Sequence, residues 1–149
     1  DGDIKEIISE LLDSDEFWNQ DNFSAKYKTP YRYVVSSLRA TDAVVLQSKP
    51  IVGFLHIQGM PMYRCLTPDG YKNTEKAWLH PTGLIQRIEF ATILTSGRHP
   101  AARARETNPN VLLELAGIDS TGKTGQVIAS SNEKLKMALA IGSPEFMKH

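Results

Sequence analysis

The spacing of apolar residues predicts helices along most of the chain, beginning with its first segment. There the apolar side chains recur at positions i, i+3, i+4, i+7 and i+8 of one helical face: Ile4, Ile7, Ile8, Leu11 and Leu12. A second helix is predicted to start at the capping residue Thr29, with Pro30 in its first turn, and to end near Thr41. We expect its buried face to consist of Tyr31, Val34, Val35 and Leu38.

Residues 43–79 give a less regular pattern. A short helix is predicted from Pro50 to Gly59, and the β-branched residues of this segment leave a strand as the alternative. Residues 58–79 are predicted to form a long loop, in which Thr67-Pro-Asp-Gly70 matches a type I turn. Long irregular segments of compact domains are usually functional or disordered, and the aromatic and methionine side chains of this one favour order.

A helix at about 81–96 is predicted to be the centre of the fold, because it is apolar on most of its sides. Two more helices are predicted, one beginning at Asn108-Pro109 and one over residues 133–141. The sequence gives no convincing strand pair or hairpin signal. The predicted fold class is therefore all-α: an irregular bundle of about five to seven helices around the central helix, with a long ordered loop at about 58–79.

A short capping pattern, Ser-x-Glu-Phe, occurs once near each end of the chain, at Ser14–Phe17 and at Ser143–Phe146. Both copies have the composition of a helix start, and we expect Phe17 and Trp18 to enter the core. The repetition suggests an internal duplication, with chance recurrence of good capping residues as the alternative.

Length and charge limit the possible classes of protein. The chain has 149 residues, which is enough for one domain with its own core. Its 17 basic and 17 acidic residues give no overall field that would attract nucleic acid or an anionic membrane. No stretch approaches the ~18 consecutive apolar residues of a membrane span. The single cysteine, Cys65, excludes an internal disulfide. The abrupt helical start leads us to expect one helical domain over residues 1–149, as the C-terminal fragment of a longer protein.

No motif for a metal or a cofactor withstands inspection, so we expect neither. The four histidines include no pair at i, i+4 spacing, and no Cys-x-x-Cys occurs. Residues 117–124 formally match the phosphate-loop pattern, but that loop must follow a buried parallel strand. Here the preceding residues 111–116 are predicted to be helical, which favours a chance match in a polar connector.

Paired carboxylates are the first candidate chemistry. Asp69 and Glu89 occur near Tyr71 and Trp78, and glycosidases use two carboxylates beside sugar-binding rings. The alternative is structural, with Asp69 as a turn former and Glu89 paired with a nearby cation.

Arg87 is the second candidate, because it interrupts the apolar central helix, where a buried charge is costly unless paired. The structural interpretation is a buried ion-pair network, in which Asp69 meets Arg87 or Glu89 meets a nearby cation. The candidate cations are Lys26, Lys28, Arg32 and Arg39. The functional interpretation is a small anion site formed by Lys26, Lys28 and Arg87.

Many of these residues, in this order, resemble the bacterial family catalogued as domain of unknown function 1800. The resemblance is carried by the following residues: Ser14, Glu16, Phe17, Trp18, Lys26, Lys28, Thr29, Pro30, Val34, Val35, Leu38, Arg39, Gly59, Pro68, Asp69, Gly70, Tyr71, Trp78, Arg87, Ser143, Pro144, Glu145 and Phe146. It covers residues 3–97 and 143–146, and residues 101–132 add little. The family supplies no reaction, cofactor or catalytic residue. It implies a bacterial, exported protein, with a periplasmic, cell-surface or secreted location.

Two functions follow as hypotheses. The first is a non-catalytic binding or structural module that contacts a partner through the loop from Met60 to Trp78, since aromatic and methionine residues are common at interfaces. The candidate partners are another exported protein or a surface polymer, not nucleic acid. The second is a hydrolase of a polymer or ester, with Asp69, Glu89, Arg87 and Lys26 at its site and Tyr71 and Trp78 binding substrate. Whether the protein is an enzyme stays open.

Overall fold

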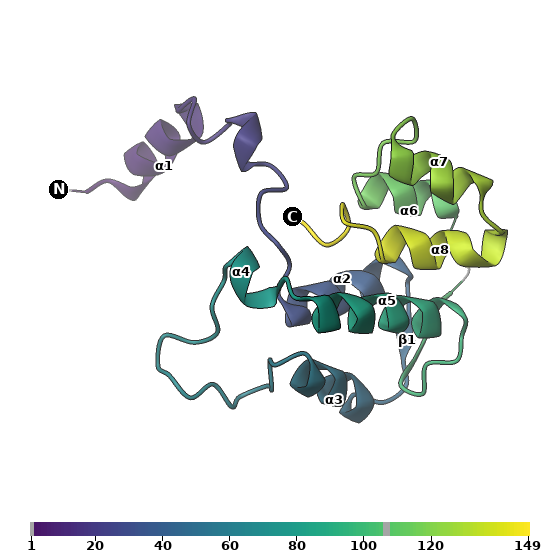
Figure 1. Cartoon of the computed structure of the whole chain (residues 1–149). Coiled ribbons are helices and arrows are strands. Elements are labelled where there is room, and N and C mark those ends of the chain that lie inside the picture. The colour runs from purple at the N-terminus through teal and green to yellow at the C-terminus, as the bar shows by residue number, and fades with distance from the viewer. Residues whose placement is uncertain (1, 106–107) are drawn as a thin grey trace.

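The computed structural model describes residues 2–105 and 108–149, and it is mostly helical (Figure 1). The elements in chain order are α1 (Ile4–Asp13), the 3-10 turn η1 (Gln20–Asn22), α2 (Pro30–Ala40), β1 (Val44–Val45), α3 (Lys49–Ile57), α4 (Glu75–Trp78), α5 (Pro81–Thr95), β2 (Ala102–Arg103), α6 (Pro109–Leu115), α7 (Lys123–Ser130) and α8 (Glu133–Ile141). The predicted irregular helical bundle is therefore confirmed, with an added two-residue strand pair. No helix of the described part is both long and apolar enough to cross a membrane.

The helix α5 lies in the middle of the bundle, as its composition predicts. It packs most extensively against α8, which in turn contacts α6 and α7, while α2 contacts α3 (Figure 1). Its buried side is formed by Gly83, Arg87, Phe90, Ala91 and Leu94. Its apolar composition does not mean burial on every side, because Ile85 and Ile88 on the opposite side are 66% and 50% exposed.

The helix α2 begins as predicted, but its buried face is rotated from the predicted one. The hydroxyl of Thr29 accepts a hydrogen bond from the backbone N–H of Arg32, and Pro30 occupies the first turn. Tyr33, Val34 and Ser37 are buried, whereas Tyr31 is 45% exposed. Tyr33 occupies the core in place of Tyr31 because its ring contacts both Phe90 and Phe146 edge-on.

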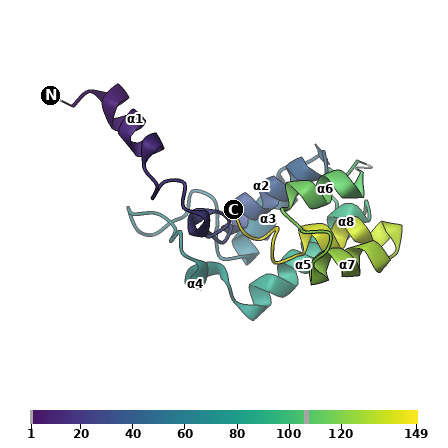
Figure 2. The same cartoon turned by 90° about the horizontal axis from the view of Figure 1, so that it is seen from above.

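The helix α1 stands apart from the rest of the molecule in both views (Figures 1 and 2). It has no buried residue, and the five apolar side chains of its predicted stripe are 44–72% exposed. The expectation that Phe17 and Trp18 enter the core was also wrong, since they are 42% and 57% exposed and pack on each other. The amphipathic pattern was correct for a helix, but nothing in the described chain covers its apolar face.

Two short antiparallel pairings join distant segments and were not predicted. Val44 and Val45 pair with Arg103 and Ala102, so that β1 and β2 form a two-stranded sheet. A single bridge joins Tyr27 to Lys148. Two-residue strands carry too little periodicity to be recognised in a sequence.

The segment around residues 117–131 contains the helix α7, which was not predicted because this segment is polar in composition. Gly122 precedes α7, and Gly125 inside α7 lies against the backbone of Asp119 and Ser120. The phosphate-loop pattern at residues 117–124 follows the helix α6. A phosphate-binding loop follows a buried strand, so the structure agrees with the interpretation of this pattern as a chance match.

The two Ser-x-Glu-Phe segments share a local contact but not a setting. In each, the serine Oγ accepts a hydrogen bond from the backbone N–H of the phenylalanine, at 3.3 Å for Phe17 and 3.1 Å for Phe146. Both segments form turns without a continuing α-helix. Phe146 is 3% exposed, whereas Phe17 lies in solvent, so the shared sequence does not fix the packing.

Candidate functional site

The side chain of Arg87 is the most unusual buried group in the described chain, because it is fully buried without a carboxylate. Its guanidinium lies 4.7 Å from the ring centre of Tyr27 and 5.0 Å from that of Tyr33. Its Nη2 donates a hydrogen bond to the main-chain oxygen of Lys28 at 3.0 Å, and its Nε donates to Oε1 of Gln58 at 3.4 Å. Nη1 has no hydrogen-bond partner in the described part of the protein.

The surroundings of Arg87 stabilise its charge through ring faces and carbonyl oxygens. Burial lowers the pKa of Arg87, and the neighbouring Tyr27 and Tyr33 oppose that shift. Two ring faces held against one guanidinium give favourable cation–π contacts. The hydroxyl of Tyr33 donates to the main-chain oxygen of Arg87 at 2.8 Å, which fixes the ring in place. The cluster therefore joins α2, α5 and the segment before α2, and the Arg87 side chain within it is fully buried.

The predicted ion pair between Arg87 and Asp69 is wrong. Asp69 is exposed on the loop and pairs with Lys72 at 3.0 Å. The pKa of Asp69 is lowered by its hydrogen bonds to Thr67 and Lys72. Glu89 is exposed on another side of α5 and forms no ion pair within the described residues. Asp69, Glu89 and Arg87 of the hydrolase hypothesis therefore do not surround one pocket.

Lys28 lies close to Arg87, whereas Lys26 does not join the cluster. The Nζ of Lys28 donates to the main-chain oxygen of Phe146 at 2.6 Å and lies 4.0 Å from the centre of that ring. Burial, and then the charge of Arg87, lower the pKa of Lys28 to about 8. Lys26 is exposed, and its backbone pairs with that of His149. The small anion site predicted from Lys26, Lys28 and Arg87 is therefore not formed as a unit.

The predicted aromatic pair of the loop serves as an internal anchor. The rings of Tyr71 and Trp78 meet edge-on, with centres 6.2 Å apart. The Tyr71 hydroxyl donates to the main-chain oxygen of Pro61, and the Trp78 Nε1 donates to that of Lys72, each at 2.6 Å. Trp78 is 7% exposed. The two rings hold the loop closed beside a shallow hollow of about 390 Å³.

Two side chains of the same loop lie fully in solvent. Tyr63 is 98% exposed and Leu66 is 99% exposed. The backbone of Tyr63 has a φ of 59°, in the left-handed region that bulky residues rarely adopt. The anchored loop therefore presents two large apolar side chains to solvent.

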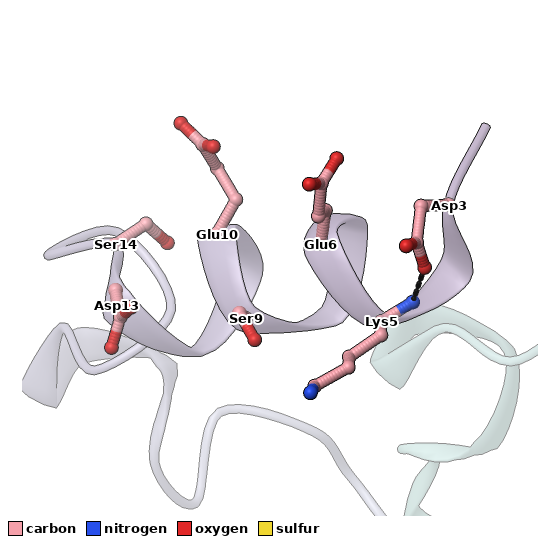
Figure 3. Close-up of a pocket in the computed structure, with 7 residues that line it drawn as sticks. All are labelled: Asp3, Lys5, Glu6, Ser9, Glu10, Asp13 and Ser14. Carbon is pink, nitrogen blue, oxygen red and sulfur yellow. Dashed lines mark hydrogen bonds between the residues drawn. The ribbon is translucent and has the colours of Figure 1, made fainter. Parts of the chain in front are cut away.

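A hollow of about 790 Å³ runs along α1 (Figure 3). Every residue that lines it belongs to α1 or directly adjoins it, and Glu6 and Glu10 point side by side toward solvent. No second element closes this hollow, so it is open surface and forms no binding site. Within residues 2–105 and 108–149, no group of three or more His, Cys, Asp or Glu is placed to hold a metal ion.

Comparison with known proteins identifies the family. The model of the family described as "Protein of unknown function (DUF1800)" matches residues 1–148. The chain belongs to the DUF1800 family. No curated protein and no solved structure matches it. The family match confirms the resemblance that was based on the separate sequence segments, and it extends through residues 101–132, where the sequence offered no recognisable signal.

Among the residues that shape the candidate site, sequence reasoning missed Gln58, Tyr27 and Tyr33. Gln58 was interpreted only as the end of a helix, yet it also donates to Oε1 of Gln86 at 2.6 Å. The signal that could have found the tyrosines is the single arginine on the apolar side of α5, because a buried guanidinium without a carboxylate needs ring faces.

Proposed function

We propose that this DUF1800 chain is a non-catalytic helical module that docks on a partner protein, with the apolar stripe of α1 as its main contact. The observation that carries the proposal is that every side chain of this stripe is 44–72% exposed: Ile4, Ile7, Ile8, Leu11 and Leu12. Apolar side chains at i, i+3, i+4, i+7 and i+8 are the pattern by which a helix lies in a protein groove. An aliphatic stripe favours a protein partner over a surface polymer.

The loop between α3 and α4 offers a second contact surface at the same end of the molecule as α1. Both views place α1 and the loop between α3 and α4 at one end, away from α6 and α7 (Figures 1 and 2). The exposed Tyr63 and Leu66 belong to this loop. Exposed apolar side chains on both segments support contact with a partner at this end of the molecule.

The hydrolase hypothesis receives no support from the geometry. Asp69 is paired on an exposed loop, Glu89 faces solvent, and Arg87 is closed off by two tyrosine rings. A hydrolytic site needs its acid, base and binding groups around one position where a substrate atom can sit.

The test is photocrosslinking from a single position of α1 in the producing cell. A crosslinking amino acid at Ile8, on the stripe, is expected to capture one protein that then binds the purified chain directly. The matched control places the same group at Glu10, on the polar face, where capture is expected to be at least several-fold weaker. Ile8→Asp should abolish direct binding of that protein, because a carboxylate in an apolar contact is strongly unfavourable.

Two outcomes contradict the proposal. Equal capture from Ile8 and Glu10 means that the stripe has no specific partner. Crosslinks from Ile8 to another part of the same polypeptide mean that the stripe belongs to an internal core rather than to a docking surface.

We also propose that the protein is bacterial and exported, with a periplasmic, cell-surface or secreted location. The support is the family resemblance alone. Fractionation of the producing cell, with detection of this chain by an antibody, tests it. Recovery in the cytoplasmic fraction would contradict it.

A further inference from the structure

The outward side of α2 carries a groove lined by several basic side chains. Two hollows of about 390 and 220 Å³ lie along this helix and share Lys28, Ser36 and Arg39. The smaller hollow is also lined by Arg32 and His149. Neither hollow is lined by an aspartate or a glutamate. The chain as a whole has no net charge, whereas Lys28, Arg32 and Arg39 line this groove without an acidic side chain among its lining residues.

The cations of the groove have no counter-charge. Within the described part of the protein, none of Lys28, Arg32 and Arg39 forms an ion pair with a carboxylate. The Nη1 of Arg32 lies 2.5 Å from Nε2 of His149, so these two basic side chains are in direct contact with each other. Burial, followed by the charges of Arg32, Lys28 and Lys26, lowers the pKa of His149. Its Nδ1 is buried without a partner.

The spacing along α2 defines the ligand that fits. Arg32 and Arg39 are seven residues apart on one helix, which corresponds to roughly 10 Å along its axis. A guanidinium binds a carboxylate through two parallel hydrogen bonds. Between the two arginines lies Ser36, which offers a hydroxyl, and Tyr31 contributes an exposed ring beside Arg32. Two anionic groups separated by a hydroxyl-bearing, ring-shaped body would match these side chains.

We propose that this groove binds an acidic polysaccharide, whose carboxylates lie on Arg32 and Arg39. Sugar rings supply the hydroxyl groups and flat faces that suit Ser36 and Tyr31, and uronic acids supply carboxylates at repeating distances. Single-stranded nucleic acid fits less well, because it uses several aromatic rings as stacking platforms and this groove exposes only the ring of Tyr31 among its lining residues. The groove is separate from α1, so this inference does not depend on the docking proposal.

The experiment is calorimetric titration of the whole chain with a tetramer of galacturonic acid. Arg32→Gln and Arg39→Gln are expected to weaken binding at least tenfold each, as loss of a charged hydrogen-bonding partner does. Lys76→Gln is the matched control, because Lys76 is exposed on α4 outside the groove, and it is expected to leave the affinity unchanged. A neutral galactose tetramer is expected not to bind, and 0.5 M salt is expected to weaken the acidic tetramer through charge screening. Circular dichroism of each variant checks that the helices are intact.

Three results would overturn the inference. The first is an absence of binding at millimolar tetramer. The second is unchanged affinity in the Arg32→Gln, Arg39→Gln double variant. The third is equal or tighter binding of tripolyphosphate, single-stranded DNA or an acidic peptide, each of which would assign the groove to another class of ligand.

Discussion

Arg87 is a buried cation whose charge is balanced without an acidic residue. Two tyrosine rings face its guanidinium, and two carbonyl oxygens accept its hydrogen bonds. The rings come from residues 27 and 33, on either side of the start of α2, and the arginine comes from α5. Arg87 therefore joins the first part of the bundle to its central helix.

This role predicts a graded response to substitution at Arg87. Arg87→Ala leaves a cavity and removes the contacts of both rings, so we expect a loss of about 3 kcal/mol in the free energy of unfolding. Arg87→Met keeps most of the volume and removes the buried charge, so its loss should be less than half as large. Urea unfolding of the three proteins measures both values. Equal losses would show that charge, and not volume, dominates the site.

The lowered pKa of Lys28 leads to a prediction of how the stability of the fold depends on pH. Its folded pKa of about 8 is below the ordinary value of 10.5, so the unfolded chain binds more protons between these two values. Stability should therefore rise as the pH increases from about 8 to about 10. Burial raises the pKa of Tyr27 and Tyr33, so above pH 10 the unfolded chain loses protons first and stability should fall.

Thermal unfolding at several pH values tests this profile. Lys28→Met should remove the rise between pH 8 and 10 while keeping the fall above pH 10. Lys26→Met, at an exposed neighbouring position, should keep both. A rise that persists in Lys28→Met would assign it to another group.

At the scale of elements, apolar periodicity and caps predicted most helices but not which side of each is covered. α2, α3, α5, α6 and α8 occur where the sequence indicated them. Tyr31 was assigned to the core from its position in a stripe, but Tyr33 occupies the core because it can reach Phe90, Phe146 and the backbone of Arg87. Such long-range contacts have no local signature. The helix α7 was not predicted, because its glycine and polar residues give no helical pattern of apolar positions.

The glycine inside α7 predicts a test of that packing. A Cβ added at Gly125 would overlap the main-chain oxygen of Asp119, so we expect Gly125→Ala to destabilise the fold by about 1–3 kcal/mol. Gly53 in α3 has no atom within 4 Å of its added Cβ, so Gly53→Ala should instead stabilise by roughly 0.5–1 kcal/mol. Urea unfolding measures both. A neutral Gly125→Ala would mean that α7 shifts away from the preceding turn.

At the scale of the whole molecule, the sequence predicted the amphipathic character of α1 but not its isolation. The same periodicity describes a helix packed in the core and a helix that meets another protein, because it records only which face is apolar. The predicted candidate site was not formed, because sequence proximity does not show where the fold places each side chain. Asp69, Arg87 and Glu89 were grouped by chemistry and proximity in the sequence, whereas the fold directs them to a loop, the core and open solvent.

The most direct measurement of the docking account is amide hydrogen exchange of the purified chain, resolved by segment. We predict that the amides of α1 exchange at nearly the rate of an unfolded peptide, because no tertiary contact buries this helix. The amides of α5 should exchange only through global unfolding, because α5 forms the centre of the core. If α1 is instead protected as strongly as α5, the apolar stripe is covered within the chain itself, and the docking account is contradicted.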